Sequence, residues 1–225
     1  MLLVRQVTDA VLAALLAPPC VCCGRVLDRP LAGAVCEACW STLPRVSVPS
    51  ACVSSRIARS TAIGEYEGTL RTIIHALKYD GRRSVATGLS RTLAACGAEL
   101  LADADAVIPV PLHRRRERER GFNQALDLAT GLGRPVWRPL RRLRDTRSQV
   151  ELPARERQQN VRDAFGLIPP RPWRRADRLH GAIVVLVDDV TTTGATLDAC
   201  ARTLMAAGAH EVRALTAARV ANGPR

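Results

Sequence analysis

The sequence predicts an α/β fold with a doubly wound, mainly parallel sheet, preceded by a small cysteine-rich module. Two continuous apolar runs, at 106–113 and 183–188, are typical of strands buried on both faces. Segments with helical periodicity alternate with these runs, as in a parallel sheet with crossover helices. Only 3% of the residues are aromatic against 47% hydrophobic, so aliphatic side chains must fill the core.

The chain divides into four expected parts: a helix over 1–19, the cysteine module over 20–45, a linker over 46–60 and a larger domain over 61–220. The elements of the larger domain are expected in this order: a short strand and turn at "IGEYEG", helices 69–79 and 84–101, strand 106–113, a helix from near Phe122, a short strand near Val136, strand 183–188, helix 195–207 and strand 211–219. The charge-dense run "RRRERERG" lies between a strand and a helix, and we interpret it as a loop.

The first segment has a short apolar stretch interrupted by Asp9, and no small-x-small cleavage pattern follows it. These features favour a docking helix of a cytoplasmic protein over a signal peptide. No segment is long enough to span a membrane, so an integral membrane protein is not expected. The formal net charge of +12 comes mostly from arginine, which suggests phosphate-bearing partners, although an arginine-favouring genome would also produce it.

Six of the eight cysteines lie between residues 20 and 52. They include two Cys-x-x-Cys pairs, formed by Cys20, Cys23, Cys36 and Cys39. Two such pairs can close a tetrahedron of thiolates around a structural zinc ion, whereas disulfides are not expected in the cytoplasm. Cys22 could replace Cys20 as a ligand, and Cys52 has no paired partner. A closed four-thiolate site should stabilise the module rather than catalyse.

The segment "VVLVDDVTTTGAT" at 184–196 combines a buried strand, two acids and a loop that enters a helix. The strand delivers Asp188 and Asp189 to the carboxyl edge of the sheet, where ligands of such folds bind. The loop offers backbone amides and hydroxyls to a phosphate through Thr191, Thr192, Thr193, Gly194, Ala195 and Thr196. The carboxylates would repel that phosphate and instead suit a ribose diol, directly or through magnesium. 5-Phosphoribosyl 1-pyrophosphate (PRPP) has both features.

These thirteen residues resemble the PRPP-binding signature of type I phosphoribosyltransferases. Together with the cysteine pairs, three further segments make the chain similar to the ComF competence-protein family over nearly all residues after 19. They are "ALKYDGR" at 76–82, "PVPLHRRRERERGFNQA" at 109–125 and "RDTRSQVELPARERQQNVRDAF" at 144–165. The resemblance implies a type I phosphoribosyltransferase-like fold, with residues 61–220 as the transferase domain.

A departing pyrophosphate needs cations, and we expect Arg118 and Arg120 to supply them from the loop after strand 106–113. The same loop is expected to contribute Pro111, His113, Arg114, Gly121, Asn123 and Gln124. Asn123 could equally cap the following helix. The resemblance also implies a hood over the sugar, with Arg144, Thr146, Gln149, Arg157 and Asn160, although an ordinary solvated loop has the same composition. Lys78 is either a basic residue near the site or simply part of a helix end.

The implied reaction is a magnesium-dependent transfer of phosphoribosyl to a nitrogen base with release of pyrophosphate, linked to DNA uptake or nucleotide metabolism. No segment identifies the acceptor. The alternative is a non-catalytic PRPP or nucleotide sensor that binds single-stranded DNA or competence-machinery proteins, which the positive charge permits. The three tryptophans are dispersed along the chain, which does not favour a base-stacking platform.

Overall fold

The fold is built on a five-stranded sheet with the strand order β1-β2-β7-β6-β3. This computed structural model describes residues 6–8, 11, 18–44, 48–49, 54–143, 164–169 and 176–220. The strands are β1 (Val48–Pro49), β2 (Ser60–Glu65), β3 (Ala106–Pro109), β6 (Ile183–Thr191) and β7 (Glu211–Arg219). Strands β2, β7, β6 and β3 run parallel, and β1 adds an antiparallel edge. The predicted α/β class with a mainly parallel sheet is confirmed.

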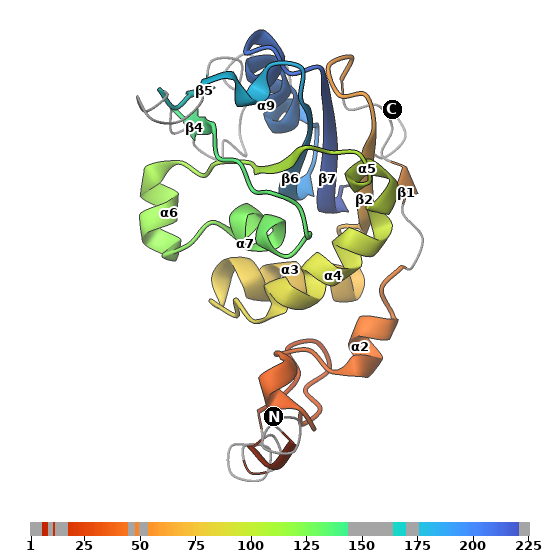
Figure 1. Ribbon diagram of the computed structural model, residues 1–225. Coiled ribbons are helices and arrows are strands. Elements are labelled where there is room, and N and C mark those ends of the chain that lie inside the picture. The colour runs from red at the N-terminus through yellow and green to blue at the C-terminus, as the bar shows by residue number, and fades with distance from the viewer. Residues whose placement is uncertain are drawn as a thin grey trace.

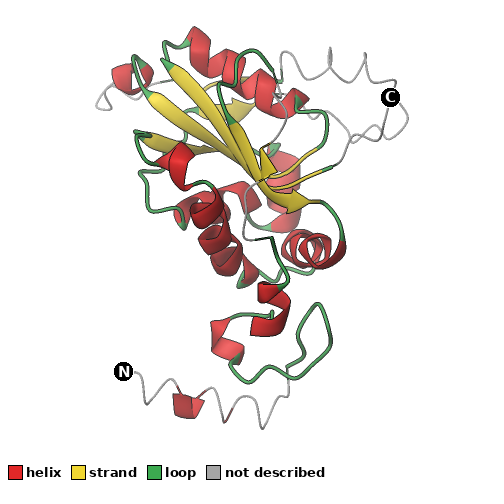
Figure 2. Cartoon of the chain, turned by 90° about the vertical axis from the view of Figure 1, so that its right-hand side faces the viewer, coloured by secondary structure: helices red, strands yellow, loops and turns green. Residues whose placement is uncertain are grey.

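Helices cover both faces of this sheet (Figures 1 and 2). One face carries α3 (Gly68–Tyr79), α4 (Val85–Cys96), α5 (Ala98–Leu101) and α7 (Gln124–Thr130), and the other carries α9 (Ala195–Ala206). Alternation along β6 sends Val185 and Val187 into the first hydrophobic cluster and Val184 and Leu186 into the second. Because β6 is buried on both sides, its sequence reads as a continuous apolar run.

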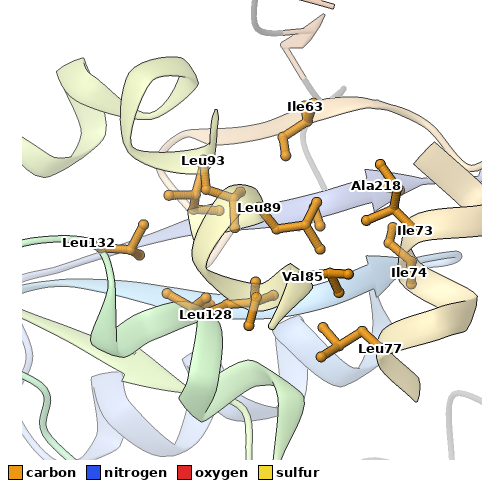
Figure 3. Packing of buried hydrophobic residues seen from close by; sticks show 14 of the residues in the cluster. Ile63, Ile73, Ile74, Leu77, Val85, Leu89, Leu93, Leu128, Leu132 and Ala218 are labelled. Carbon is orange, nitrogen blue, oxygen red and sulfur yellow. The ribbon is translucent and has the colours of Figure 1, made fainter. Parts of the chain in front are cut away.

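The first cluster is aliphatic, as the low aromatic content predicts. Figure 3 shows Ile73, Ile74 and Leu77 of α3 packed with Leu89 and Leu93 of α4. The helix expected over 84–101 is divided at Gly97 into α4 and α5. A side chain at Gly97 would lie 2.7 Å from a methyl group of Leu215 on β7, so this glycine allows the helix end to approach the sheet closely.

The interpretation of "RRRERERG" as a loop is wrong, because these residues form helix α6 (Arg114–Arg120). His113 caps its start, since Nδ1 accepts a hydrogen bond from the Arg115 N–H at 3.3 Å. Arg115 and Glu119 form an ion pair of 2.8 Å one turn apart. Gly121 ends the helix in the left-handed region with φ 77°. Local capping and alternating charge therefore make a helix without an apolar stripe.

A second, two-stranded sheet pairs β4 (Leu140–Arg142) with β5 (Phe165–Leu167) in antiparallel fashion. The Leu143 N–H donates to the Ala164 carbonyl at 2.7 Å, so the chain on either side of 144–163 is held together. The sequence pattern did not predict this pair. The strand expected near Val136 is reduced to a single bridge with Val107.

The cysteine module packs beside α3 and α4 (Figure 1) and contains the 3₁₀ turn η1 (Pro30–Ala32) and helix α2 (Glu37–Ser41). Its residues Leu27, Val35 and Leu43 belong to the same hydrophobic cluster as the first sheet face. Of the expected helix over 1–19, residues 6–8 and 11 are helical, whereas Pro18 and Pro19 are not, and Pro19 forms a bridge with Val26. Within the described part of the chain, none of the helices is both long and apolar enough to cross a membrane.

Candidate functional site

The two acids lie at the carboxyl end of β6, as predicted, and Asp189 is the more deeply buried of them. Its side chain is 6% exposed, and its Oδ1 lies 2.8 Å from Nζ of Lys78, the penultimate residue of α3. Its Oδ2 is buried and has no hydrogen-bond partner among the described residues. The Asp189 carboxylate is therefore held by one oxygen, while its other oxygen remains available to a ligand.

Asp188 is half-buried and occupies a different environment. Its Oδ1 accepts a hydrogen bond from the Asp189 N–H at 2.9 Å. Burial and the neighbouring Asp189 carboxylate raise the pKa of Asp188 to about 7, although that N–H and the charges of Lys78 and Arg142 oppose the rise. Because side chains alternate along a strand, the two acids approach the end of β6 from opposite faces, each with a cation nearby.

The loop after the acids leads directly into α9. Gly194 adopts φ 75° at the N-cap position, a left-handed conformation that favours glycine. Thr192 and Thr193 are exposed, Thr191 is buried, and Ala195 and Thr196 are half-buried. Thr193 Oγ1 accepts from the Ala195 N–H at 3.4 Å. The first N–H groups of this twelve-residue helix lack partners within the helix, so the bend suits an anion.

The connection after β3 begins beside the acids, since the Val110 N–H donates to the Val187 carbonyl at 2.9 Å. Asn123 caps α7: its Oδ1 accepts from the Ala125 N–H at 2.9 Å, and its Nδ2 donates to the Val110 carbonyl at 3.1 Å. Both polar atoms of Asn123 are thus used within the fold, which supports the capping alternative. Gln124 is buried, and its Oε1 has no partner within the described ranges.

The predicted pyrophosphate-loop arginines differ in their surroundings. Arg120 places Cζ 5.3 Å from the centre of the Tyr79 ring, whereas Arg118 donates to the Arg114 carbonyl of its own helix at 3.3 Å. An open pocket of about 380 Å³ lies between α3 and α6, lined by Lys78, Tyr79, Arg116, Glu119 and Arg120. Of the arginines predicted to be catalytic, Arg120 lines this pocket and Arg118 does not.

The remaining residues of that connection lie around α6. Pro111 and His113 are half-buried before its first turn, Arg114 is exposed, and Gly121 closes it. Arg83, which directly follows the "ALKYDGR" segment, donates to both carboxylate oxygens of Asp127 on α7 at 2.7 and 2.8 Å, and Tyr79 of that segment lies against Arg120. The two segments that the sequence offered separately therefore lie side by side.

Of the two interpretations that the sequence left open for Lys78, the structure agrees with a basic residue near the site, because its side chain contacts Asp189 and also lines the pocket. The pocket therefore opens next to the acids. Arg116 was not singled out at all, because the family resemblance pointed to Arg118 and Arg120 within the same run. All five expected hood residues, Arg144, Thr146, Gln149, Arg157 and Asn160, lie outside the described residues.

The four predicted zinc ligands do come together. The sulfur atoms of Cys20, Cys23, Cys36 and Cys39 all lie within 4.8 Å of one another. Cys23 Sγ and Cys36 Sγ lie 3.7 Å apart. Cys20 Sγ accepts from the backbone N–H groups of Cys22 at 3.5 Å and Cys36 at 3.4 Å, as thiolates in such knuckles do. This set could hold a structural zinc ion.

The alternative ligand Cys22 is not in that set. Burial, then the charge of Cys20, raises the pKa of the Cys22 thiol to about 12. Cys20 differs: burial raises its pKa, but the backbone N–H groups of Cys36, Cys23 and Cys22 together outweigh this and lower it to about 6. The cysteines of the described module are free thiols rather than disulfides. Of the two alternatives that the sequence left open, the geometry favours Cys20.

Comparison with known proteins agrees with this geometry. Residues 125–224 match the phosphoribosyl transferase domain family, a range that includes β6, its loop, α9 and β7. The DNA utilization protein YhgH of Escherichia coli O157:H7 is 35% identical over 168 residues, which cover 69% of each chain.

Two relatives are named as competence proteins. Competence protein F of Haemophilus influenzae is 34% identical over 170 residues, covering 70% of this chain and 71% of that protein. Competence protein ComFC of Bacillus subtilis is 29% identical over 193 residues, covering 84% of this chain and 72% of that protein. On this similarity, the chain belongs to the ComF family and carries its phosphoribosyltransferase domain behind a four-cysteine module.

Proposed function

We propose that this chain binds PRPP with Mg²⁺ at the carboxyl ends of β3 and β6, and transfers its phosphoribosyl group to a nitrogen base with release of pyrophosphate. The proposal rests on the relative positions of three features of the structure. The acid pair, the anion-binding bend before α9 and the cation-lined pocket lie next to one another on the connections that follow β6, β3 and β2. PRPP presents a diol, a 5-phosphate and a pyrophosphate in the same relation.

The acids are assigned to the sugar and the bend to its phosphate. Asp188 and Asp189 accept hydrogen bonds from the two ribose hydroxyls. The residues from Thr191 to Thr196 surround the 5-phosphate with N–H and hydroxyl donors. Both acids precede the bend along β6.

The oxygen donors of this site suit magnesium. The Oδ2 of Asp189, which has no hydrogen-bond partner in the described ranges, and the half-buried carboxylate of Asp188 are hard oxygen ligands at the place where the diol is assigned. When bound, Mg²⁺ would supply charge neutralisation to the diol and the pyrophosphate. The two carboxylates would hold the ion there directly or through water.

Transfer needs a bond between a ring nitrogen of the acceptor and C1, while the C1–oxygen bond breaks and pyrophosphate leaves with the bonding electrons. Arg116 and Arg120, in the wall of the pocket, are placed to offset the charge that develops on that leaving group. Positioning and electrostatics thus account for the catalysis, and no protein nucleophile is required. Residues 144–162, which lie outside the described residues between β4 and β5, are proposed as the hood over the sugar.

The relatives' names link them to DNA utilization and competence, and we extend that link to the role of this chain. The transferred group would then reach a base or nucleotide handled during DNA uptake. A non-catalytic sensor of PRPP that binds single-stranded DNA or competence partners is the competing outcome of the experiment.

The test is calorimetry with PRPP in the presence and absence of Mg²⁺, followed by pyrophosphate release across a panel of nucleobases. The variant Asp188→Asn/Asp189→Asn should lose PRPP binding, because it replaces both carboxylates, which would hold the diol and Mg²⁺, with neutral amides that each keep one acceptor oxygen and add N–H donors. Glu99→Gln, which removes an exposed carboxylate of α5 at the amino ends of the strands, should bind normally. Absence of PRPP binding by the unmodified chain would refute the proposal. PRPP binding without turnover on any base would favour the non-catalytic sensor over the transferase.

A further inference from the structure

The basic residues of this chain are almost uniformly arginine. Of the 33 lysines and arginines, Lys78 is the single lysine. An ordinary solvated cation could be either residue type, and everywhere else this chain uses arginine. The one lysine stands at the end of α3, where its side chain is only 15% exposed. The composition therefore indicates that position 78 requires lysine rather than arginine.

The surroundings of Lys78 explain the choice. Its Nζ lies 2.8 Å from Asp189 Oδ1, in a contact where both side chains are largely withdrawn from water. An ammonium group is a compact point charge on an unbranched stem, whereas a guanidinium is a broad planar fork. A fork placed here would engage both oxygens of the carboxylate. The ammonium engages one and leaves Oδ2 without a hydrogen-bond partner in the described part of the chain.

An unpaired buried acceptor destabilises the ligand-free protein. This arrangement therefore favours a ligand that donates a hydrogen bond to Asp189 Oδ2. The same ammonium lines the pocket that also contains Arg116 and Arg120. Lys78 therefore stands between the acid pair and the cation-lined pocket, and it adjoins both.

We propose that Lys78 is a positioning residue of the PRPP site, an assignment that rests on the proposed function. Its ammonium fixes Asp189 through Oδ1 so that Oδ2 faces the sugar diol, and it extends the positive wall that receives the pyrophosphate. The role requires lysine itself and not merely a positive charge.

Three variants test this by PRPP calorimetry with Mg²⁺. Lys78→Met should weaken PRPP binding by about 10- to 100-fold, because removing one partner of a little-exposed ion pair leaves the other charge uncompensated. Lys78→Arg keeps the charge but should remain within about 3-fold of Lys78→Met, because the fork occupies both carboxylate oxygens. Arg91→Met, which removes an exposed charge from α4, is the matched control and should bind like the unmodified chain.

A second measurement does not depend on any Lys78 variant folding. Lysine-selective ¹⁵N labelling gives one side-chain ammonium signal, because the chain has one lysine. That signal should shift when PRPP is added and should also change in Asp189→Asn. A signal indifferent to Asp189→Asn, or a Lys78→Arg variant that binds PRPP as tightly as the unmodified chain, would overturn this inference alone. Failure of the unmodified chain to bind PRPP would overturn the proposed function, and this inference with it.

Discussion

Trp40 of the cysteine module packs against Gly88 of helix α4, and replacing this glycine with alanine should disrupt that contact. A Cβ atom at Gly88 would lie 2.2, 2.6 and 2.8 Å from three atoms of the Trp40 indole. Ordinary contacts are about 3.5–4.0 Å, so the ring would have to move by more than about 1 Å. Trp40 is stiff and packed against the hydrophobic cluster, so the strain cannot be relieved by a flexible side-chain end.

The magnitude follows from two opposing effects of Gly88→Ala. Overpacking of this severity should cost close to the upper end of about 1–3 kcal/mol. Alanine improves the helix over glycine by about 1 kcal/mol. The net loss in the free energy of unfolding is then about 2 kcal/mol, which corresponds to a fall in Tm of about 4–8 °C for a chain of this size.

The assay is a double-mutant cycle with Trp40→Ala, followed by far-ultraviolet circular dichroism during denaturation. Without the indole, the clash disappears and Gly88→Ala should stabilise by about 1 kcal/mol through helix propensity alone. The sign of the effect should therefore reverse between the two backgrounds, with a coupling of about 3 kcal/mol. If Gly88→Ala has the same sign in both backgrounds, the docking of Trp40 on α4 is refuted.

Three further outcomes are expected. Tyr79→Ala should weaken pyrophosphate binding by about 2- to 5-fold in calorimetry, because it removes the ring beneath the Arg120 guanidinium, whereas Tyr79→Phe should keep it; equal loss in both would point to the hydroxyl instead. Metal analysis should find close to one zinc per chain, and Cys36→Ser should lower it; an unchanged ratio would exclude Cys36 as a ligand. Hydrogen bonding from the buried Arg213 lowers the pKa of Asp103 to about 2, below the usual value of about 3.9. This stabilisation is present above pH of about 4 and is lost as the pH falls toward about 2, so Asp103→Asn should show a smaller fall in Tm across that window; an equal fall would assign the acid sensitivity to other groups.

Some features were predictable because their signals are local. The strand 183–188, the acids that follow it and the turn into helix 195–207 were all read from one uninterrupted segment, and the structure places them so. The spacing of the two cysteine pairs predicted a site of four thiolates, and their sulfur atoms lie within 4.8 Å of one another. Short-range periodicity, turn chemistry and ligand spacing are properties of neighbouring residues, so they can be recognised without knowledge of the rest of the chain.

Other features depended on how distant segments return to one place. Helix α6 lacks an apolar stripe, so only its caps and one ion pair reveal it. The ion pair between Lys78 and Asp189 joins α3 to the end of β6. The close packing of Trp40 against Gly88 joins the cysteine module to α4. The α/β class with a mainly parallel sheet and the place of the two acids at the end of β6 could be predicted from local sequence patterns. The pairing of Lys78 with Asp189 could not, because it depends on how helices pack against the sheet, which no local pattern encodes.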